Sequence, residues 1–444
     1  MNTTGPSETL DHQTTLMGTL SGLFNKEEFS DLRLVVNQTL SLNVHRFILA
    51  VRSEVFRALL DTERWADAKG RVVQLTEDGD CLAHFPDFLR YLYSGSVALD
   101  TGNALALHAL SEKYAVGELR ESCRLFMLAN VAAPGTCNRA VSWHRYAKLA
   151  GLGRLEEQCL RFIGWNLDTV IESPDWAQME PGPLGSLLQR SDLVVEDEAV
   201  LFRALASWLS PRPGRAQEML AHLRYPMMPP DKLFELQAPG GLAEGLASYL
   251  LRESLLVYQA HLLPAEAIAR QHDLTAIPFT MRLYTAGRVS ALWDIPGYGA
   301  MSKTVLSKSM YTRFFQLKTE WSLTYFPKGH RIVTQRHTHY TYHGYDQVVQ
   351  EDDFATLSVS VTGCDPADKS HSHKNHSHKL SVLLYRCVRG EWFVCEVKTL
   401  EVPHGGEAEI HDLIPLSERD QYVSDDTMKL CLVGQTVWEK SESV

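Results

Sequence analysis

Two stretches decide the fold of the N-terminal third, FSDLRLVV at residues 29–36 and VHRFILAVRSEVFRALL at residues 44–60. The first contains LRLVV, a run of branched apolar residues that is typical of a β-strand. The second has apolar residues at helical spacing, namely Phe47, Leu49, Val55, Phe56 and Leu59. A strand is therefore followed, after a short connection, by helix.

The residues around these two stretches complete an α+β pattern. Asn37 and Gln38 mark a turn into TLSLNV, which predicts a second strand, and RVVQL at residues 71–75 predicts a third. Three helical stretches follow, CLAHFPDFLRYLYSG, GNALALHALSEKYAV and ELRESCRLFMLANV. Helices and strands in this order predict an α+β domain over residues 10–131.

An amphipathic helix is predicted ahead of the first strand, within residues 11–26. Its apolar residues recur at spacings i, i+4, i+7 and i+8, which places them on one stripe. These residues are Leu16, Leu20, Leu23 and Phe24. The stripe either closes the core of its own domain or contacts another molecule.

The remainder of the chain divides into a helical region and a β-rich region. Pro134-Gly135 punctuates the sequence, and residues 135–263 show successive helical patterns with short polar or Pro/Gly breaks, as in a helix bundle or short solenoid. Residues 278–444 contain short runs rich in Val, Thr, Tyr, Phe and Trp. Leu357 to Val361 alternates with period two, and Arg389-Gly390 predicts a hairpin turn. This region is predicted to be all-β and sandwich-like.

Composition excludes some functions. The net charge of −11 and the pI near 5.9 argue against nucleic-acid binding, which requires a basic face. The most apolar long stretch, residues 245–263, is interrupted by Arg252 and Glu253, so no membrane span is predicted. The chain has eight cysteines and no CxxC pair; they suit buried thiols, and their even number also permits disulfides.

The N-terminal third resembles the BTB/POZ domain over about 120 residues. The resemblance is carried by FSDLRLVV, VHRFILAVRSEVFRALL, FLRYLYSG and LSEKYAV, and it includes Asp31, His45, Arg52-Ser53, Phe56, Tyr93 and Gly95. It implies structural roles for these residues, with Tyr93 as a packing anchor and Gly95 as a helix C-cap. It also implies a dimer in which the first helix packs against its twin, which places Leu16, Leu20, Leu23 and Phe24 at the contact.

The helical region resembles the BACK domain, which often follows BTB. LEEQCLRFIGWNL, LLQRSDLVVEDE, RYPMMPPDKLFELQ and AIPFTMRLYT are similar to the group of BTB/POZ proteins that includes galectin-3-binding protein, as is TEWSLTYFP in the β-rich region. No stretch of the sequence resembles the scavenger-receptor domain that precedes BTB in galectin-3-binding protein. The opening MNTTGPSETLDHQ has neither the basic start nor the apolar core of a secretory signal.

The resemblance implies a secreted, glycosylated adhesion or scaffold protein that forms homodimers or higher oligomers and binds lectins or matrix. The alternative from the same fold is a cytoplasmic BTB–BACK substrate adaptor for a cullin ubiquitin ligase. Such adaptors usually carry a hydrophobic-x-Glu signature, and the nearest approximation is Trp65-Ala66-Asp67. The β-rich region also lacks the repeats of a kelch propeller. Both observations favour the adhesion or scaffold interpretation.

Two further sets of candidate residues remain. The sequons at Asn2, Asn37 and Asn375 lie in segments that read as tail, turn and loop, where glycans could be attached. The run HSHKNHSH supplies weak metal candidates, His371, His373, His376 and His378, but its context favours a solvated polar loop.

No motif of a known catalytic class is present. The sequence contains no GxSxG elbow, Walker A loop, HExxH helix or GxGxxG fingerprint. We therefore predict an interaction protein without enzymatic activity and without a cofactor.

Overall fold

The computed structural model describes residues 12–61, 70–237, 244–313, 317–329, 332–334, 348–350, 354–363, 376–403 and 406–438. It divides the chain into two compact units, one of Met1–Val131 with Trp143–Gln158 and the other of Ala132–Ser142 with Cys159–Val444. We call them the N-terminal unit and the C-terminal unit. Trp65, Asn2, Asn375, His371 and His373 lie outside the described residues.

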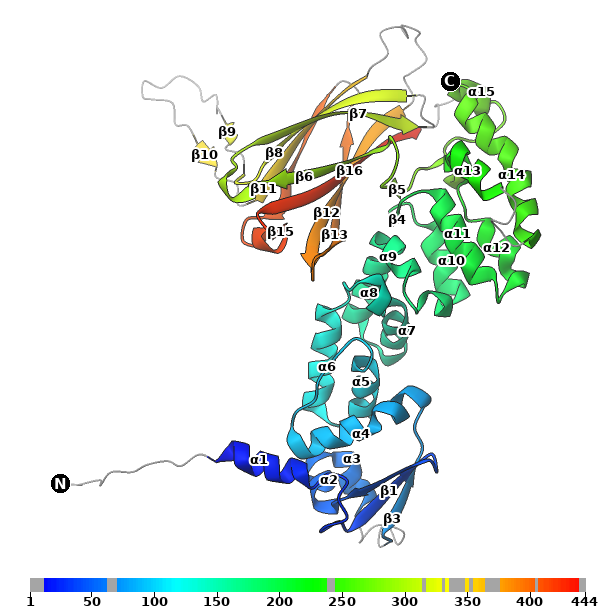
Figure 1. The fold of residues 1–444 in the computed structure, drawn as a ribbon. Helices are drawn as coiled ribbons and strands as arrows, with labels where there is room; N and C mark the ends of the chain where they lie inside the picture. The colour runs from blue at the N-terminus through cyan, green and yellow to red at the C-terminus, as the bar shows by residue number, and fades with distance from the viewer. Residues whose placement is uncertain are drawn as a thin grey trace, which may run out of the picture. The chain divides into compact units, whose positions relative to one another are not determined.

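The N-terminal unit consists of a three-stranded sheet and the helices that pack on one of its faces (Figure 1). Its elements are α1 (Gln13–Gly22), β1 (Leu32–Val36), β2 (Leu40–Val44), α2 (Arg46–Arg52), α3 (Glu54–Leu59), β3 (Val72–Leu75), α4 (Gly79–Ser94), α5 (Ala104–Lys113) and α6 (Gly117–Ala129). The sheet order is β2-β1-β3, with β1 antiparallel to β2 and parallel to β3. The three predicted strands and the α+β class are therefore confirmed.

Side chains from β1, β2 and the helices α2 to α6 form one apolar core. Leu34, Val36 and Val44 on the sheet and Leu49 and Phe56 on the helices are fully buried. Alternate residues of β1 point into this core, which is the period-two pattern of a half-buried strand. The predicted turn is present, with both Asn37 and Gln38 at positive φ.

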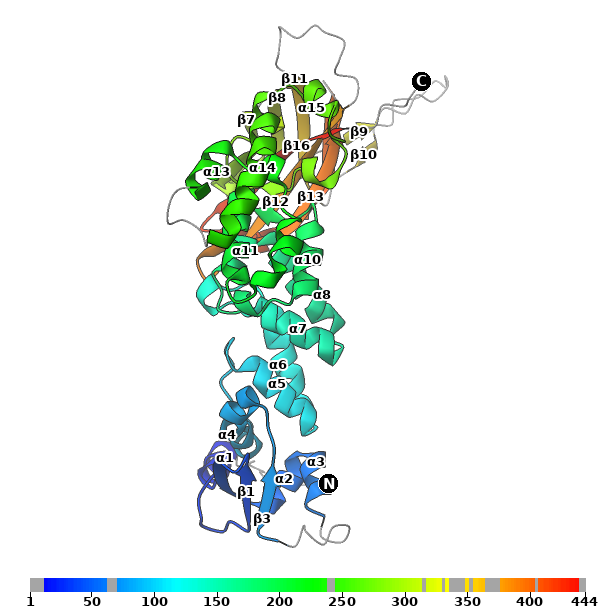
Figure 2. The ribbon, with the colours of Figure 1, turned by 90° about the vertical axis from the view of Figure 1, so that its right-hand side faces the viewer.

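Helices continue through the next part of the chain. They are α7 (Ala140–Ala150), α8 (Gly153–Trp165), α9 (Leu167–Ile171), α10 (Pro181–Gln189), α11 (Glu198–Leu209), α12 (Ala216–Leu220), α13 (Pro230–Gln237), α14 (Glu244–Leu262) and α15 (Ala265–Ala269). Short 3-10 turns connect the helices, as at Trp176–Gln178, Pro213–Arg215 and Tyr225–Met227. Figure 2 shows α11, α13 and α14 grouped together, and α13 contacts both α11 and α14. No helix among the described residues is both long and apolar enough to cross a membrane.

Two antiparallel sheets make the β-rich region a sandwich. One sheet has the order β14-β11-β8-β7, and the other has β13-β12-β16-β15 with β6 paired to β16. The strands are β6 (Ser290–Pro296), β7 (Thr304–Arg313), β8 (Leu317–Phe326), β11 (Phe354–Gly363), β12 (His376–Val388), β13 (Glu391–Val402), β14 (Glu407–Pro415), β15 (Val423–Ser424) and β16 (Thr427–Trp438). The pairs β9 (Ile332–Thr334) with β10 (Val348–Gln350) and β4 (Val194–Val195) with β5 (Leu283–Tyr284) lie apart from these sheets.

The inner faces of the two sheets enclose the sandwich core, in which Trp321, Tyr325, Leu357, Val382 and Leu430 are fully buried. The predicted hairpin turn is confirmed, because β12 pairs with β13 across two residues at positive φ. The β-rich runs of the sequence did not predict β4, β6, β7, β10, β14 or β15. Strand β6 alternates cleanly between buried and exposed residues, but its sequence SALWDIP contains Asp and Pro, which are depleted in strands.

The end of α8, the strands β4 and β5 and the sandwich share apolar contacts within the C-terminal unit. Val194 packs with Leu383 and Val394 in a second buried cluster on the outer face of the β12–β16 sheet. Asn166, between α8 and α9, donates its side-chain amide to the Val394 carbonyl at 2.9 Å and accepts the Val394 N–H at 2.8 Å. These bonds satisfy backbone groups of β13, so helices and sandwich support one another. A division at residues 10–131, 135–263 and 278–444 remains our prediction.

Candidate interaction surface

Helix α1 has no buried side chain. Its sequence QTTLMGTLSG contains two glycines and three threonines, which are poor helix formers. Isolated helices shorter than about 12–15 residues are marginal in water even when rich in alanine. Leu16 is nevertheless 60% exposed, and Met17 beside it is also exposed. Contact with α4 therefore covers only part of α1, and the remaining apolar face is open.

The predicted stripe on the first helix is divided by the structure. The helix ends at Gly22, so Leu23 and Phe24 lie beyond it and pack against the core of the N-terminal unit. The centroids of the Phe24 and Tyr93 rings lie 5.5 Å apart, and the two ring planes meet at 62°. The Arg90 guanidinium lies over the Phe24 ring, 5.3 Å from its centroid. Leu20 is half-buried, which leaves Leu16 as the exposed member of the stripe.

Helix α2 adds two exposed apolar residues: Phe47, which the sequence placed in the helical pattern without marking it as a surface residue, and Val51. Phe47 is 76% exposed and Val51, one helical turn later, is 56% exposed. The i, i+4 spacing of Phe47 and Val51 indicates that they share one face of the helix, apart from the buried Leu49. Both α1 and α2 contact α4. We call Leu16, Met17, Phe47 and Val51 the α1/α2 surface.

Polar contacts hold the start of α2 against the end of α4. The His45 backbone N–H donates to the Tyr93 hydroxyl at 2.8 Å, and the His45 Nδ1 lies 2.9 Å from the same oxygen. Burial raises the pKa of Tyr93 to about 12, so its hydroxyl stays protonated and donates to Nδ1. The Asp31 carboxylate accepts the Arg46 N–H at 2.8 Å. Gly95 ends α4 at φ 68°, as a C-cap requires. These residues act structurally.

The sequon residue Asn37 has a structural role within the described residues. Its amide nitrogen donates to the Glu77 carbonyl at 2.7 Å, and its amide oxygen accepts the Glu77 N–H at 2.9 Å. The nitrogen to which a glycan would be joined therefore ties the β1–β2 turn to the residues that follow β3. Of the three glycosylation candidates, Asn2 and Asn375 lie outside the described residues.

The histidine run is not entirely a polar loop. His376 and His378 belong to β12, and the His378 ring is buried in the sandwich, 6.2 Å from the Trp321 ring. The interpretation as a solvated loop is therefore wrong for His378. In the described part of the chain, no group of three or more His, Cys, Asp or Glu residues has a geometry that could hold a metal ion.

Seven of the cysteines lie in described segments, and all seven are free thiols. Burial raises the pKa of Cys123, Cys159 and Cys431 to about 12. A thiol with so high a pKa is a poor nucleophile at neutral pH. These three cysteines act as small apolar residues of the core.

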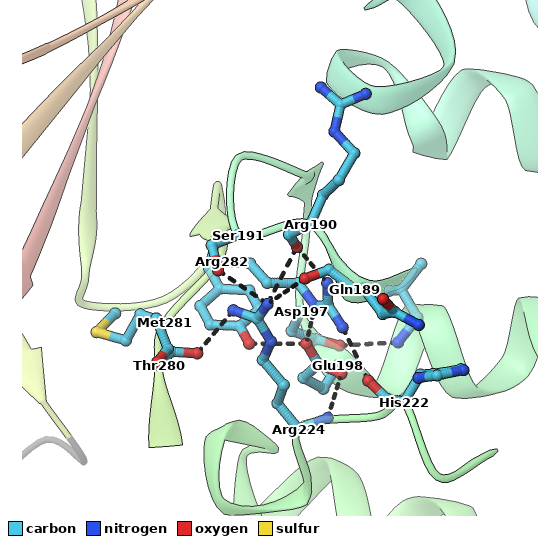
Figure 3. A network of polar contacts seen from close by, with 12 residues as sticks. Gln189, Arg190, Ser191, Asp197, Glu198, His222, Arg224, Thr280, Met281 and Arg282 are labelled. Atoms are coloured by element: carbon cyan, nitrogen blue, oxygen red, sulfur yellow. Dashed lines mark hydrogen bonds and ion pairs between the residues drawn. The ribbon is translucent and has the colours of Figure 1, made fainter. Parts of the chain in front are cut away.

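Buried charges form a cluster in the C-terminal unit (Figure 3). Glu198, at the start of α11, and Arg282, before β5, both have fully buried side chains joined by a 2.7 Å bond from Nε to Oε1. The Tyr284 hydroxyl donates to the same oxygen at 2.7 Å. Burial, and then the charge of Glu198, raises the pKa of Tyr284 well above its usual value, so this donor is retained.

A second buried guanidinium, that of Arg224, completes this cluster. Its Nη1 donates to the Thr280 carbonyl at 2.8 Å, and its Nη2 donates to the Arg190 carbonyl at 3.1 Å. Burial lowers the pKa of Arg224 to about 10, and the charge of Arg282 adds to the effect, so the side chain remains protonated at neutral pH. One carboxylate and several backbone carbonyls together compensate two cations, which fixes residues 280–284 against the helices.

Comparisons with known proteins agree with this architecture. Residues 20–130 match the family model "BTB/POZ domain", and residues 140–238 match the model "BACK: BTB And C-terminal Kelch". The chain therefore contains a BTB/POZ domain followed by a BACK domain. BTB domains commonly oligomerise and mediate protein interactions.

Two named proteins are homologues of the chain. BTB/POZ domain-containing protein 17 of Mus musculus is 35% identical over 294 residues, which cover 64% of this chain and 60% of the relative; that of Homo sapiens gives the same values. Galectin-3-binding protein of Mus musculus is 26% identical over 351 residues, covering 72% and 60%. The chain thus spans about three-fifths of the length of these relatives.

Proposed function

We propose that this chain is a non-enzymatic scaffold that self-associates through the α1/α2 surface of its BTB domain. The observation that carries the proposal is α1, a ten-residue helix without a buried side chain. A second copy would cover Leu16 and Phe47 and would remove from water the apolar area that one chain leaves exposed. The hydrogen bonds between His45 and Tyr93 hold the start of α2 against α4, so the position of Phe47 and Val51 does not depend on a partner.

Charge on this surface tests the proposal. In Leu16→Asp/Phe47→Asp, a carboxylate at each position would be buried without a partner at the contact, at a penalty of several kcal/mol. We expect the double variant to sediment as a monomer at concentrations where the wild type associates. Leu125→Asp on α6 is the matched control, because Leu125 is 52% exposed and lies outside the surface. Association that survives in the double variant would place the contact elsewhere.

We further propose an extracellular role in adhesion, with lectins or matrix proteins as partners. Its support is the homology to galectin-3-binding protein, whose name states that it binds a lectin. The compartment is tested by recovering the protein from the medium of expressing cells and treating it with a glycosidase. A glycosylated protein should lose mass on this treatment. We expect glycans at Asn2 or Asn375 and none at Asn37, whose amide is bonded to Glu77. An intracellular, unglycosylated protein that co-purifies with a cullin would instead support the adaptor alternative.

A further inference from the structure

A cavity of about 290 Å³ lies in the C-terminal unit, between residues 274–283 and the sheet that contains β12, β13 and β16. Its volume is close to the lower end of the range for ligand sites in proteins, about 300–1,000 Å³. Leu274, Phe279 and Val437 contribute apolar surface to its lining, and the sheet contributes polar side chains. The cavity therefore combines an apolar wall with a polar one.

Three neighbouring strands supply the polar wall. Lys379 and Ser381 lie two residues apart on β12, so their side chains point to the same face of the sheet. Strand pairing places Gln435 of β16 opposite Lys379, and Thr399 of β13 opposite Ser381. Residues directly opposite each other have Cβ atoms about 4.5–5.5 Å apart. These four residues all line the cavity, and we call them the polar platform.

Both charged side chains in the lining already have partners. The Lys379 ammonium lies 2.9 Å from a carboxylate oxygen of Glu401. The Asp192 carboxylate accepts two hydrogen bonds from the Arg190 guanidinium, at 2.8 and 2.6 Å. Neither Glu401 nor Arg190 lines the cavity. An ion of either sign would therefore find no unpaired counter-charge in the lining, which suits an uncharged ligand.

The neutral side chains of the polar platform retain hydrogen-bonding capacity. The Ser381 and Thr399 hydroxyls lie 2.9 Å apart, and because one donates to the other, the pair keeps one hydrogen that no described residue accepts. The Gln435 amide nitrogen donates to the Met281 and Arg282 carbonyls at 3.1 and 3.2 Å, whereas no described residue donates to its amide oxygen. Ser381 is only 1% exposed, so a ligand with matching donors and acceptors would satisfy groups that bulk water reaches poorly.

We propose that this cavity binds one ring of a neutral sugar, with its hydroxyl groups on the polar platform and its C–H face against Leu274 and Phe279. The hydroxyls of a sugar ring both donate and accept hydrogen bonds, and its C–H groups form apolar faces, so the ring matches both walls. A hydrocarbon of the same size would leave the Ser381 hydroxyl and the Gln435 oxygen without a partner, which costs free energy. The source is a glycan on a protein partner or a free saccharide. The proposal does not depend on self-association through α1.

Saturation-transfer NMR on the whole chain tests this site. The probes are the methyl glycosides of glucose, galactose, mannose and N-acetylglucosamine, with cyclohexyl methyl ether as a ring of the same size without hydroxyls. We expect at least one glycoside to bind with a dissociation constant on the order of 1 mM, and the ether to bind at least about tenfold more weakly. Ser381→Ala/Thr399→Val removes both hydroxyls together, so neither is left unpaired and the fold is retained. In this variant, binding of the glycoside should weaken at least about tenfold.

A second variant, Thr399→Tyr, should abolish binding, because Thr399 is exposed, tyrosine is favoured in strands and its ring would occupy the cavity. The control Thr324→Val/Ser358→Ala removes the same two hydroxyls from facing residues of the other sheet and should bind as the wild type does. Tighter binding of a glycopeptide with a neutral glycan supports a glycoprotein partner, and equal or weaker binding supports a free saccharide. Equal binding of the ether, unchanged binding in Ser381→Ala/Thr399→Val, or no binding of any glycoside up to about 10 mM would overturn the proposal.

Discussion

Helix α1 and the Glu198 cluster depart from ordinary burial in opposite directions. In α1, apolar side chains such as Leu16 stay exposed, whereas around Glu198 one carboxylate and two guanidiniums are fully buried. The chain compensates the buried charges itself, with the carbonyls of Arg190, directly after α10, and of Thr280. Within the described residues, no segment covers the open face of α1. The buried charges are therefore satisfied within one chain, whereas the exposed apolar side chains of α1 could be buried only by a second molecule.

Removing the carboxylate at the centre of the buried cluster is expected to have the largest effect. Glu198→Ala leaves the Arg282 and Arg224 guanidiniums buried together without a counter-charge, which should lower the free energy of unfolding by about 3–5 kcal/mol. Chemical denaturation of the C-terminal unit measures it. The control is Glu218→Ala, an exposed partner of Arg215, with an expected change of about 0–1 kcal/mol. Equal stability of both variants would refute internal compensation.

The N-terminal unit offers a similar internal polar link at Asn37. Asn37→Gly keeps the positive φ but removes both bonds to the Glu77 backbone, so we expect a loss of about 2 kcal/mol, about 1 for each bond. Gln38→Gly is the matched control, because Gln38 is exposed at a similar φ. Denaturation monitored by circular dichroism compares them. If the two variants lose the same stability, the amide of Asn37 contributes little.

Asp168 is an acid whose charge the fold compensates poorly. Its folded pKa of about 6 lies above the unfolded value of about 3.9, so the folded state binds the proton more tightly. The stability from this group is therefore full below about pH 4 and is lost as pH rises through 6. Asp168→Asn should stabilise the protein by about 2 kcal/mol at pH 8 and by little at pH 4.

Asp192 gives the control of opposite sign. Arg190 holds the pKa of that carboxyl below its usual value, so Asp192→Asn should destabilise the protein more at pH 8 than at acidic pH. Thermal unfolding of both variants across this pH range measures the two slopes. Parallel slopes would show that neither burial nor the neighbouring charges raise the pKa of Asp168 in the folded protein.

The smallest expected effect concerns the helicity of α1 itself. No atom lies within 4 Å of a Cβ added at Gly18, so Gly18→Ala should favour the helix by about 1 kcal/mol. If self-association covers α1, the dissociation constant should fall about fivefold, as measured by analytical ultracentrifugation. Gly182→Ala in α10 is equally unhindered and should leave association unchanged. Weaker association of Gly18→Ala would mean that Gly18 itself lies in the contact.

Local pattern in the sequence determined much of the fold. Branched apolar runs gave β1, β2 and β3, and Arg389-Gly390 gave the β12–β13 hairpin, because alternation and turn chemistry act between near neighbours. Strand β6 was missed, since its partner β16 lies far along the chain and its Asp and Pro are depleted in strands. The metal candidate His378 proved to be a core residue, because strand pairing, not local polarity, sets its environment.

Only the tertiary structure decided which of these residues form surfaces. The spacing of Leu16, Leu20, Leu23 and Phe24 was visible in the sequence, but the end of α1 at Gly22 turned the last two toward their own core. Arg282 and Glu198 are 84 positions apart, and nothing local shows that they share one buried site. Sequence periodicity reports which residues share a face. Whether that face is covered depends on contacts between segments far apart in the chain, and these arise only on folding.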